Sequence, residues 1–200
     1  MARRRGGVTA EEYEALLAAD PVYQAMRKAK EAEHAERVAQ RAREMRPLLD
    51  DLAAVGVIVD SPSRLLQIPD PDERIYPVLL DHLIRPDVPT LLREWIGRAF
   101  GRKSARPIVW DTLVGLIKSH RLEMSAVEGV MVAISYMARQ QDLATLIDLL
   151  EDRSIGSSRI YLVSNLMRSK KPEARAALLR NQDDPELEKE IAARLSRSRG

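Results

Sequence analysis

Apolar residues recur along most of this chain in short clusters at a regular distance. The clusters Val78–Leu83, Thr112–Ile117 and Thr145–Leu150 follow one another at intervals of roughly 33 residues, and further apolar positions follow each cluster. Repetition at this period, with two short helices in each unit, is typical of stacked helical repeats. We expect about four antiparallel helix pairs: 73–85 with 89–101, 105–118 with 125–139, 142–152 with 156–169, and 172–181 with 184–196.

The N-terminal part has the signals of two further helices. Thr9 and Glu12 have the spacing of a capping box, and Asp20-Pro21 offers a cap and a first helical residue for a second helix. The stretch 21–46 is rich in strong helix formers and predicts one long helix, which Pro47 is expected to kink or restart. Its apolar stripe is thin, so this helix either lies on its own domain or joins two copies in a homo-oligomer.

These patterns divide the chain into four parts. A basic tail, which we expect to be disordered, precedes a helical arm that ends near Gly56. A connector follows, with a β-branched run that has no partner strand and with Pro69 and Pro71 at its end. The repeat array comes last. The expected parts are residues 1–8, 9–56, 57–72 and 73–197.

The repeated helix pairs resemble those of HEAT-like repeat proteins, in particular their short-period bacterial branch. The matching positions are a proline near the first helix and a recurring Asp and Arg: Pro77, Asp81, Arg93, Asp148 and Arg159. The second pair departs from this pattern, with Gly115 in place of the Asp and Gly129 or Val130 in place of the Arg. The resemblance implies an all-α fold, a right-handed α-solenoid preceded by the long helix. It also implies a ladder of ion pairs between neighbouring repeats.

Composition narrows the functional classes. The chain has no cysteine, which excludes disulfides, thiolate metal sites and cysteine nucleophiles. No apolar run reaches the ~18 residues that span a bilayer, so we expect a cytoplasmic protein with no membrane partner, of bacterial or phage type. The net charge is only +2, but basic residues gather in 98–121 and in 153–182.

Candidate catalytic chemistry is sparse. His34, His82 and His120 have no spacing that converges on a metal, and no glycine-rich phosphate loop follows a strand. HEAT-like proteins include DNA glycosylases, so Trp110 beside Asp111 is a weak candidate for holding a damaged base. The favoured interpretation of that pair is structural, since an Asp near a helix N-terminus interacts well with the helix dipole. We expect no enzyme activity, no cofactor and no metal.

Binding is therefore the favoured function, and two surfaces are candidates. The first hypothesis is a protein-interaction or scaffold module, in which the second helix of each pair lines a concave face that binds another protein. The expected concave-face residues are Glu94, Arg98, Glu128, Ser135, Arg139, Asn165 and Arg168. The alternative is nucleic-acid binding by a basic ridge along the turns between repeats. The ridge residues are Arg102, Lys103, Arg106, Lys170, Lys171 and Arg175.

Overall fold

The structure is a computed structural model that describes residues 9–197, and it is helical, with no strand in that part of the chain. The expected disordered tail, residues 1–8, lies outside the described residues. The chain divides into two compact units, Met1–Glu44 and Met45–Gly200. The all-α prediction is confirmed for the described chain.

The first unit holds α1 (Ala10–Ala19) and the beginning of α2 (Pro21–Ala54). The capping box is present as predicted, because Thr9 Oγ1 accepts from the Glu12 N–H at 3.2 Å and Glu12 Oε2 accepts from the Thr9 N–H at 2.9 Å. The Asp20 carboxylate then accepts from the first free N–H groups of α2. No residue of α1 is buried.

The long helix does not end at Pro47. A proline inside a helix removes one backbone hydrogen bond, but α2 continues for two more turns to Ala54, and Leu48 and Leu52 of those turns are fully buried. The apolar burial of these two leucines offsets the lost bond. Gly56 follows at a φ of +89°, as a C-terminal glycine is expected to.

The second unit contains the predicted helices. After the one-turn α3, a first and a second helix alternate along the chain, and each lies inside a predicted range or within one residue of it. Two 3-10 turns, Gln140–Asp142 and Arg153–Arg159, precede α8 and α9. The helices are α3 (Pro62–Leu65), α4 (Ile75–Ile84), α5 (Thr90–Ala99), α6 (Arg106–Lys118), α7 (Met124–Met137), α8 (Leu143–Glu151), α9 (Ile160–Arg168), α10 (Pro172–Arg180) and α11 (Glu188–Arg197).

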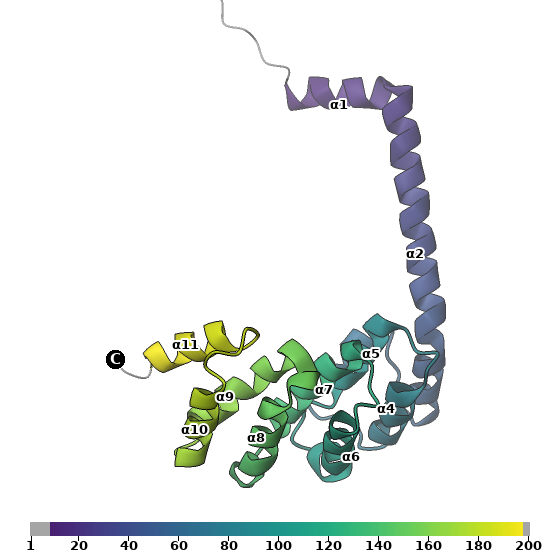
Figure 1. Ribbon diagram of the computed structural model, residues 1–200. Helices are drawn as coiled ribbons and strands as arrows, with labels where there is room; N and C mark the ends of the chain where they lie inside the picture. Colours follow the sequence, from purple (N-terminus) through teal and green to yellow (C-terminus); the bar gives the residue numbers. More distant parts are fainter. Residues whose placement is uncertain (1–8, 198–200) are drawn as a thin grey trace, which may run out of the picture. The chain divides into compact units, whose positions relative to one another are not determined.

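These helices form two rows. The second helices α5, α7, α9 and α11 lie along one side of the unit and α6, α8 and α10 along the other (Figure 1). Each second helix contacts the next one, and α8 contacts α10. One continuous apolar core runs between the rows, with Phe100, Met131, Leu150 and Leu178 almost fully buried. No pair could bury its apolar face alone, which is the physical reason that the pairs pack in series.

Buried arginines connect consecutive pairs. Arg93 donates to the carbonyls of Arg85 and Pro86 at 2.9 and 2.8 Å and pairs with Glu123, the residue before α7, the second helix of the next pair. Arg159 makes the corresponding contacts between the third and the fourth pair. It donates to the Leu150 carbonyl at 3.2 Å and pairs with Asp184 at 3.0 Å. The two arginines of the HEAT-like pattern therefore have equivalent structural roles.

The prediction that Asp81 and Asp148 are the acidic partners of these arginines is wrong. Asp81 lies 3.9 Å from Arg85 of its own turn, and Asp148 pairs at 3.0 Å with Lys118 of the preceding helix pair. Both carboxylates are exposed, whereas the buried guanidinium groups lie beside acids that precede the second helix of the following pair, Glu123 before α7 and Asp184 before α11. In the second pair, which lacks the Arg of the pattern, Arg106 supplies the connection through Asp142 at 2.8 Å.

Candidate basic binding surface

Three of the predicted concave-face residues form a polar network across α5, α7 and α9. Arg98 donates at 2.9 Å to Glu94 of its own helix and at 2.9 Å to Glu128 of α7. The Tyr161 hydroxyl of α9 donates to the same Glu128 oxygen at 2.8 Å. Burial, together with this bond to a carboxylate, raises the pKa of Tyr161 above its ordinary value. These side chains are occupied with one another and hold the second helices in register.

Ser135 and Asn165 form a second cross-link between α7 and α9. The Asn165 amide donates to the Ser135 carbonyl at 2.8 Å, and Ser135 Oγ lies 2.7 Å from Asn165 Oδ1 and 2.8 Å from the Tyr161 carbonyl oxygen. Both residues are half-buried. Their first role is therefore to join the two helices.

Arg139 and Arg168 differ from the other predicted concave-face residues. Each lies at the C-terminal end of a second helix, Arg139 just after α7 and Arg168 as the last residue of α9. Both side chains are exposed, and neither has a carboxylate partner among residues 9–197. They line a pocket of about 340 Å³. The pocket is completed by Tyr136, Ala138, Gln140, Leu143, Leu146, Asn165 and Ser169.

A second pocket of about 290 Å³ adjoins the first. Ser169 lines both, so the two pockets meet at the turn between α9 and α10. Lys170, Lys171 and Arg175 line the second pocket, and none of them has a carboxylate partner in the described part of the chain. Its apolar lining comes from Leu166, Met167, Pro172, Leu178 and Leu195.

The two pockets bring together residues that were predicted on two different surfaces. Arg139 and Arg168 come from the predicted concave face, and Lys170, Lys171 and Arg175 come from the predicted ridge. We call these five cations, with the two pockets, the basic surface. Between Arg168 and Arg175 the only acidic residue in the sequence is Glu173. Five cations with so few acids nearby create a positive potential that favours an anionic ligand.

The remaining ridge residues do not continue this surface. The Arg102 guanidinium donates to the backbone carbonyls of Leu65 and Pro69, which fixes the α3 turn. Arg106 was predicted to face solvent but is buried against Asp142, and its guanidinium carbon lies 4.0 Å from the centre of the Trp110 ring. Burial in an ion pair removes Arg106 from any phosphate-binding ridge. Lys103 alone is exposed in this group.

The weaker candidates are the pair Trp110 and Asp111 and the histidines, and the side chains around them do not form a catalytic or metal site among the described residues. Arg106 covers one face of Trp110, and Asp111 is exposed in the first half of α6. His82 is buried, with Nε2 2.7 Å from Asp51 Oδ2, and His120 lies 3.2 Å from Ser154 Oγ. Residues 9–197 contain no group of three or more His, Asp or Glu side chains arranged to hold a metal ion. None of the described helices has the length and apolarity needed to cross a membrane.

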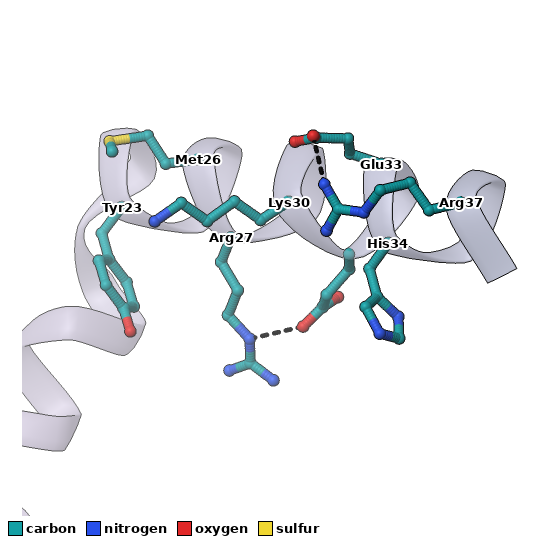
Figure 2. Close-up of a pocket in the computed structure, with 8 residues that line it drawn as sticks. Tyr23, Met26, Arg27, Lys30, Glu33, His34 and Arg37 are labelled. Carbon is teal, nitrogen blue, oxygen red and sulfur yellow. Dashed lines mark hydrogen bonds and ion pairs between the residues drawn. The ribbon is translucent and has the colours of Figure 1, made fainter. Parts of the chain in front are cut away.

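A hollow in the first unit lies on a single helix face. It measures about 620 Å³ and is lined only by residues of α2 between Tyr23 and Arg37. The ion pairs Arg27–Glu31, at 2.8 Å, and Arg37–Glu33, at 2.5 Å, lie on this face. Figure 2 shows Arg37 and Glu33 turned toward each other. A face without opposing walls does not enclose a small molecule, so it is a weaker site candidate than the basic surface.

Sequence reasoning missed the apolar and aromatic parts of the basic surface. Tyr136 is 63% exposed, and it lies three residues before Arg139 on α7. Leu143 and Leu146 look like ordinary core positions of α8, because one face of each points to the core. A tyrosine and an arginine three residues apart at the end of the predicted helix were the available signal for the pocket.

Comparison of the chain with protein-family models, with curated proteins and with solved structures finds no match.

Proposed function

We propose that this protein is a non-enzymatic protein-interaction module whose basic surface binds an acidic, amphipathic segment of a partner protein. The observation that carries the proposal is the set of five cations without carboxylate partners around two adjoining pockets, each lined by both polar and apolar side chains. Most other cations of the second unit are engaged: Arg93, Arg98, Arg106 and Arg159 all pair with acids. Unpaired cations in one place leave charge that a partner can neutralise.

The pocket linings favour a peptide over a simple polyanion. Tyr136 is 63% exposed at one pocket, and Met167 and Leu195 are half-buried at the other. Covering the exposed part of these side chains gains free energy, and a phosphate backbone has no apolar groups to cover them. A segment with apolar residues at helical spacing and carboxylates beside them satisfies both the linings and the cations.

We also propose the finer architecture that this function uses, a right-handed HEAT-like α-solenoid of four helix pairs. Its support is the serial contact of α5, α7, α9 and α11 and the equivalent positions of Arg93 and Arg159. In such an array the second helices line the concave side, where the ends of α7 and α9 carry Arg139 and Arg168.

Nucleic-acid binding is the second candidate, and Tyr136 is the observation that favours it. This exposed aromatic ring lines the same pocket as Arg139 and Arg168, and an aromatic face beside cations can stack on a base. The weakness of this candidate is the small number of cations that face solvent, now that Arg102 and Arg106 are engaged inside the protein.

The test measures binding of a fluorescent synthetic peptide to the full-length protein by anisotropy. The peptide carries leucine and glutamate in an amphipathic helical pattern. Arg168→Glu combined with Lys171→Glu should weaken binding by about tenfold or more. The matched control combines Arg121→Glu with Lys189→Glu, two exposed cations outside the basic surface, and should leave the affinity within about twofold.

Two results would contradict the proposal. Equal weakening by both double variants would mean that the peptide senses only net charge. A single-stranded RNA that binds more tightly than the peptide, and loses affinity steeply as salt is added, would replace the protein partner with nucleic acid.

A further inference from the structure

The first pocket of the basic surface, at the ends of α7 and α9, offers a ligand mostly polar groups. Its two leucines are buried, and its exposed side chains are Tyr136, Arg139, Gln140 and Arg168. Its volume of about 340 Å³ lies at the lower end of the range of roughly 300–1,000 Å³ that is usual for small-ligand sites. A ligand group that enters this pocket therefore meets two guanidinium groups, an amide and a phenol ring.

The guanidinium group of Arg139 has no acid to pair with, because the nearest acid in the sequence is already used. Asp142 Oδ1 accepts from the buried Arg106 guanidinium at 2.8 Å, and Asp142 Oδ2 accepts from the backbone N–H of Arg139 at 2.6 Å. These two bonds fix the backbone at Arg139 and occupy both oxygens of the carboxylate. The Arg139 side chain is left exposed, without a carboxylate partner among residues 9–197.

Arg168 is in the same situation at the end of α9. The nearest acid in its sequence is Glu173, in the first turn of α10, and no ion pair joins the two within the described chain. Both guanidinium groups line the same pocket. Two like charges on one small pocket are unfavourable until an anion lies between them.

We propose that this pocket binds a phosphoserine or phosphothreonine side chain of the partner segment. The inference rests on the proposed function and specifies the residue that anchors the acidic segment. A phosphate monoester carries a charge of about −1.5 to −2 near pH 7 and three acceptor oxygens, so it can accept from both guanidinium groups at once. A carboxylate has a single charge and two oxygens, and one guanidinium group satisfies it.

The same comparison of charges favours a phosphopeptide over nucleic acid. The phosphates inside a nucleic-acid chain are diesters with one charge each, and they bind to a track of cations. Such a track does not continue to the turn before α6, because Arg102 and Arg106 are engaged inside the protein. The three cations of the second pocket adjoin the first pocket at Ser169, where they can pair with carboxylates beside the phosphorylated residue.

The test compares three forms of the acidic peptide that differ at one position in the first turn of its helix. This position holds serine, glutamate or phosphoserine, and a phosphate is compatible with that end of a helix. Anisotropy with the full-length protein should give about tenfold tighter binding for the phosphoserine peptide than for the glutamate peptide, and the serine peptide should bind most weakly. Equal affinities for the phosphoserine and glutamate peptides would overturn the phosphate site.

Arg139→Lys combined with Arg168→Lys tests the geometry of the pocket at constant charge. Lysine keeps the positive charge and its favourable interaction with the end of the helix, but it lacks the two parallel N–H groups of a guanidinium. The preference for phosphoserine over glutamate should fall to about threefold or less, and the affinity for the glutamate peptide should stay within about twofold. Circular dichroism should show unchanged helix content, since both side chains are exposed.

The matched control is Arg175→Lys, which makes the same exchange at an exposed arginine of the second pocket. This variant should keep the full preference for phosphoserine. A preference that survives in the double variant, or that falls equally in the control, would overturn the assignment to Arg139 and Arg168.

The three peptides also separate this inference from the proposed function. If the glutamate peptide binds and phosphoserine adds nothing, the phosphate site alone is overturned. If none of the peptides binds, both proposals are overturned. Binding of the phosphoserine peptide alone would support the phosphate site and contradict a general affinity for acidic segments. A 5′-phosphorylated RNA that binds more tightly than the phosphoserine peptide would overturn the assignment to a protein partner.

Discussion

Gly97 of α5 and Gly129 of α7 face each other so closely that neither position has room for a side chain. A Cβ on Gly97 would lie 2.7 Å from the Gly129 carbonyl carbon, and a Cβ on Gly129 would lie 3.0 Å from Gly97 Cα and would overlap the Glu94 carbonyl oxygen. The atoms in the way are backbone, which cannot move aside as a flexible side chain can. This backbone contact brings α5 and α7 together and places Arg98 within reach of Glu128.

Gly129→Ala should therefore destabilise the protein. The new methyl group would force α5 and α7 apart, which we expect to lower the free energy of unfolding by about 1–3 kcal/mol. Urea denaturation followed by circular dichroism at 222 nm measures the change. The control is Gly115→Ala in α6, where an added Cβ meets nothing within 4 Å and should raise the stability by up to about 1 kcal/mol. Equal effects at the two positions would contradict the close contact.

Local signals predicted the helices well because they are encoded by a few neighbouring residues. Pro86 and Pro89 separate α4 from α5 as expected, and Pro172 begins α10. Pro47 is the exception, and its reason is tertiary: whether a helix continues through a proline depends on what the following turn can bury. Leu48 and Leu52 are buried in the core of the second unit. The residues near Pro47 in the sequence do not predict this burial.

The ion pair between Arg159 and Asp184 should make the free energy of unfolding depend on pH in the acidic range. The hydrogen bond from Arg159 is the main cause that lowers the pKa of Asp184 below its ordinary value of 3.8. The folded state thus binds fewer protons than the unfolded state in this range. The stabilisation is present above about pH 4 and is lost as the pH falls through the folded pKa.

Asp184→Asn should reduce this dependence and also lower stability at neutral pH. Removing one charge leaves Arg159 buried with less compensation, at a cost of about 3 kcal/mol or more. Thermal unfolding of the wild type and the variant between about pH 2.5 and 7 measures both effects. This range brackets the titration of an ordinary carboxyl group, at about 3.9. Arg153→Ala is the control, because that exposed side chain lies 3.6 Å from the same carboxylate and should change stability by less than about 1 kcal/mol. A variant that keeps the full acid dependence would show that other carboxyls cause it.

Thr9→Ala should loosen the start of α1 without affecting the second unit. The substitution removes the hydroxyl that accepts from the Glu12 N–H and so leaves that amide without its cap. Hydrogen exchange at residues 11–13 should become faster, while the amides of α7 should keep their protection. The Glu12 pKa, lowered chiefly by the Thr9 backbone N–H, should stay below 4.5, because this donor survives the substitution. A Glu12 pKa at its ordinary value in the variant would contradict the assigned cause.

The exposure of the cations was less predictable than the helices, because it depends on which charges are paired. A guanidinium can be neutralised by an acid far away in the sequence: Arg106 meets Asp142, and Arg98 meets Glu128. The two partners are 36 positions apart in the first case and 30 in the second. Arg139 and Arg168 have the same chemistry as Arg106, and only the packed structure distinguishes the exposed cations from the buried one.

The hydrogen bonds between Ser135 and Asn165 should couple α7 to α9 energetically. Ser135→Ala removes a hydroxyl that lies 2.7 Å from Asn165 Oδ1, and Asn165→Ala removes the amide that donates to the Ser135 carbonyl. Each single change should cost about 1–2 kcal/mol, since a half-buried group loses its partner. The double variant should cost less than the sum of the two, with a coupling of about 1 kcal/mol in a double-mutant cycle. The cycle Ser135→Ala with Thr112→Ala, a pair in different helices without a shared contact, should be additive. Additivity in the first cycle would contradict the coupling of the two helices through these hydrogen bonds.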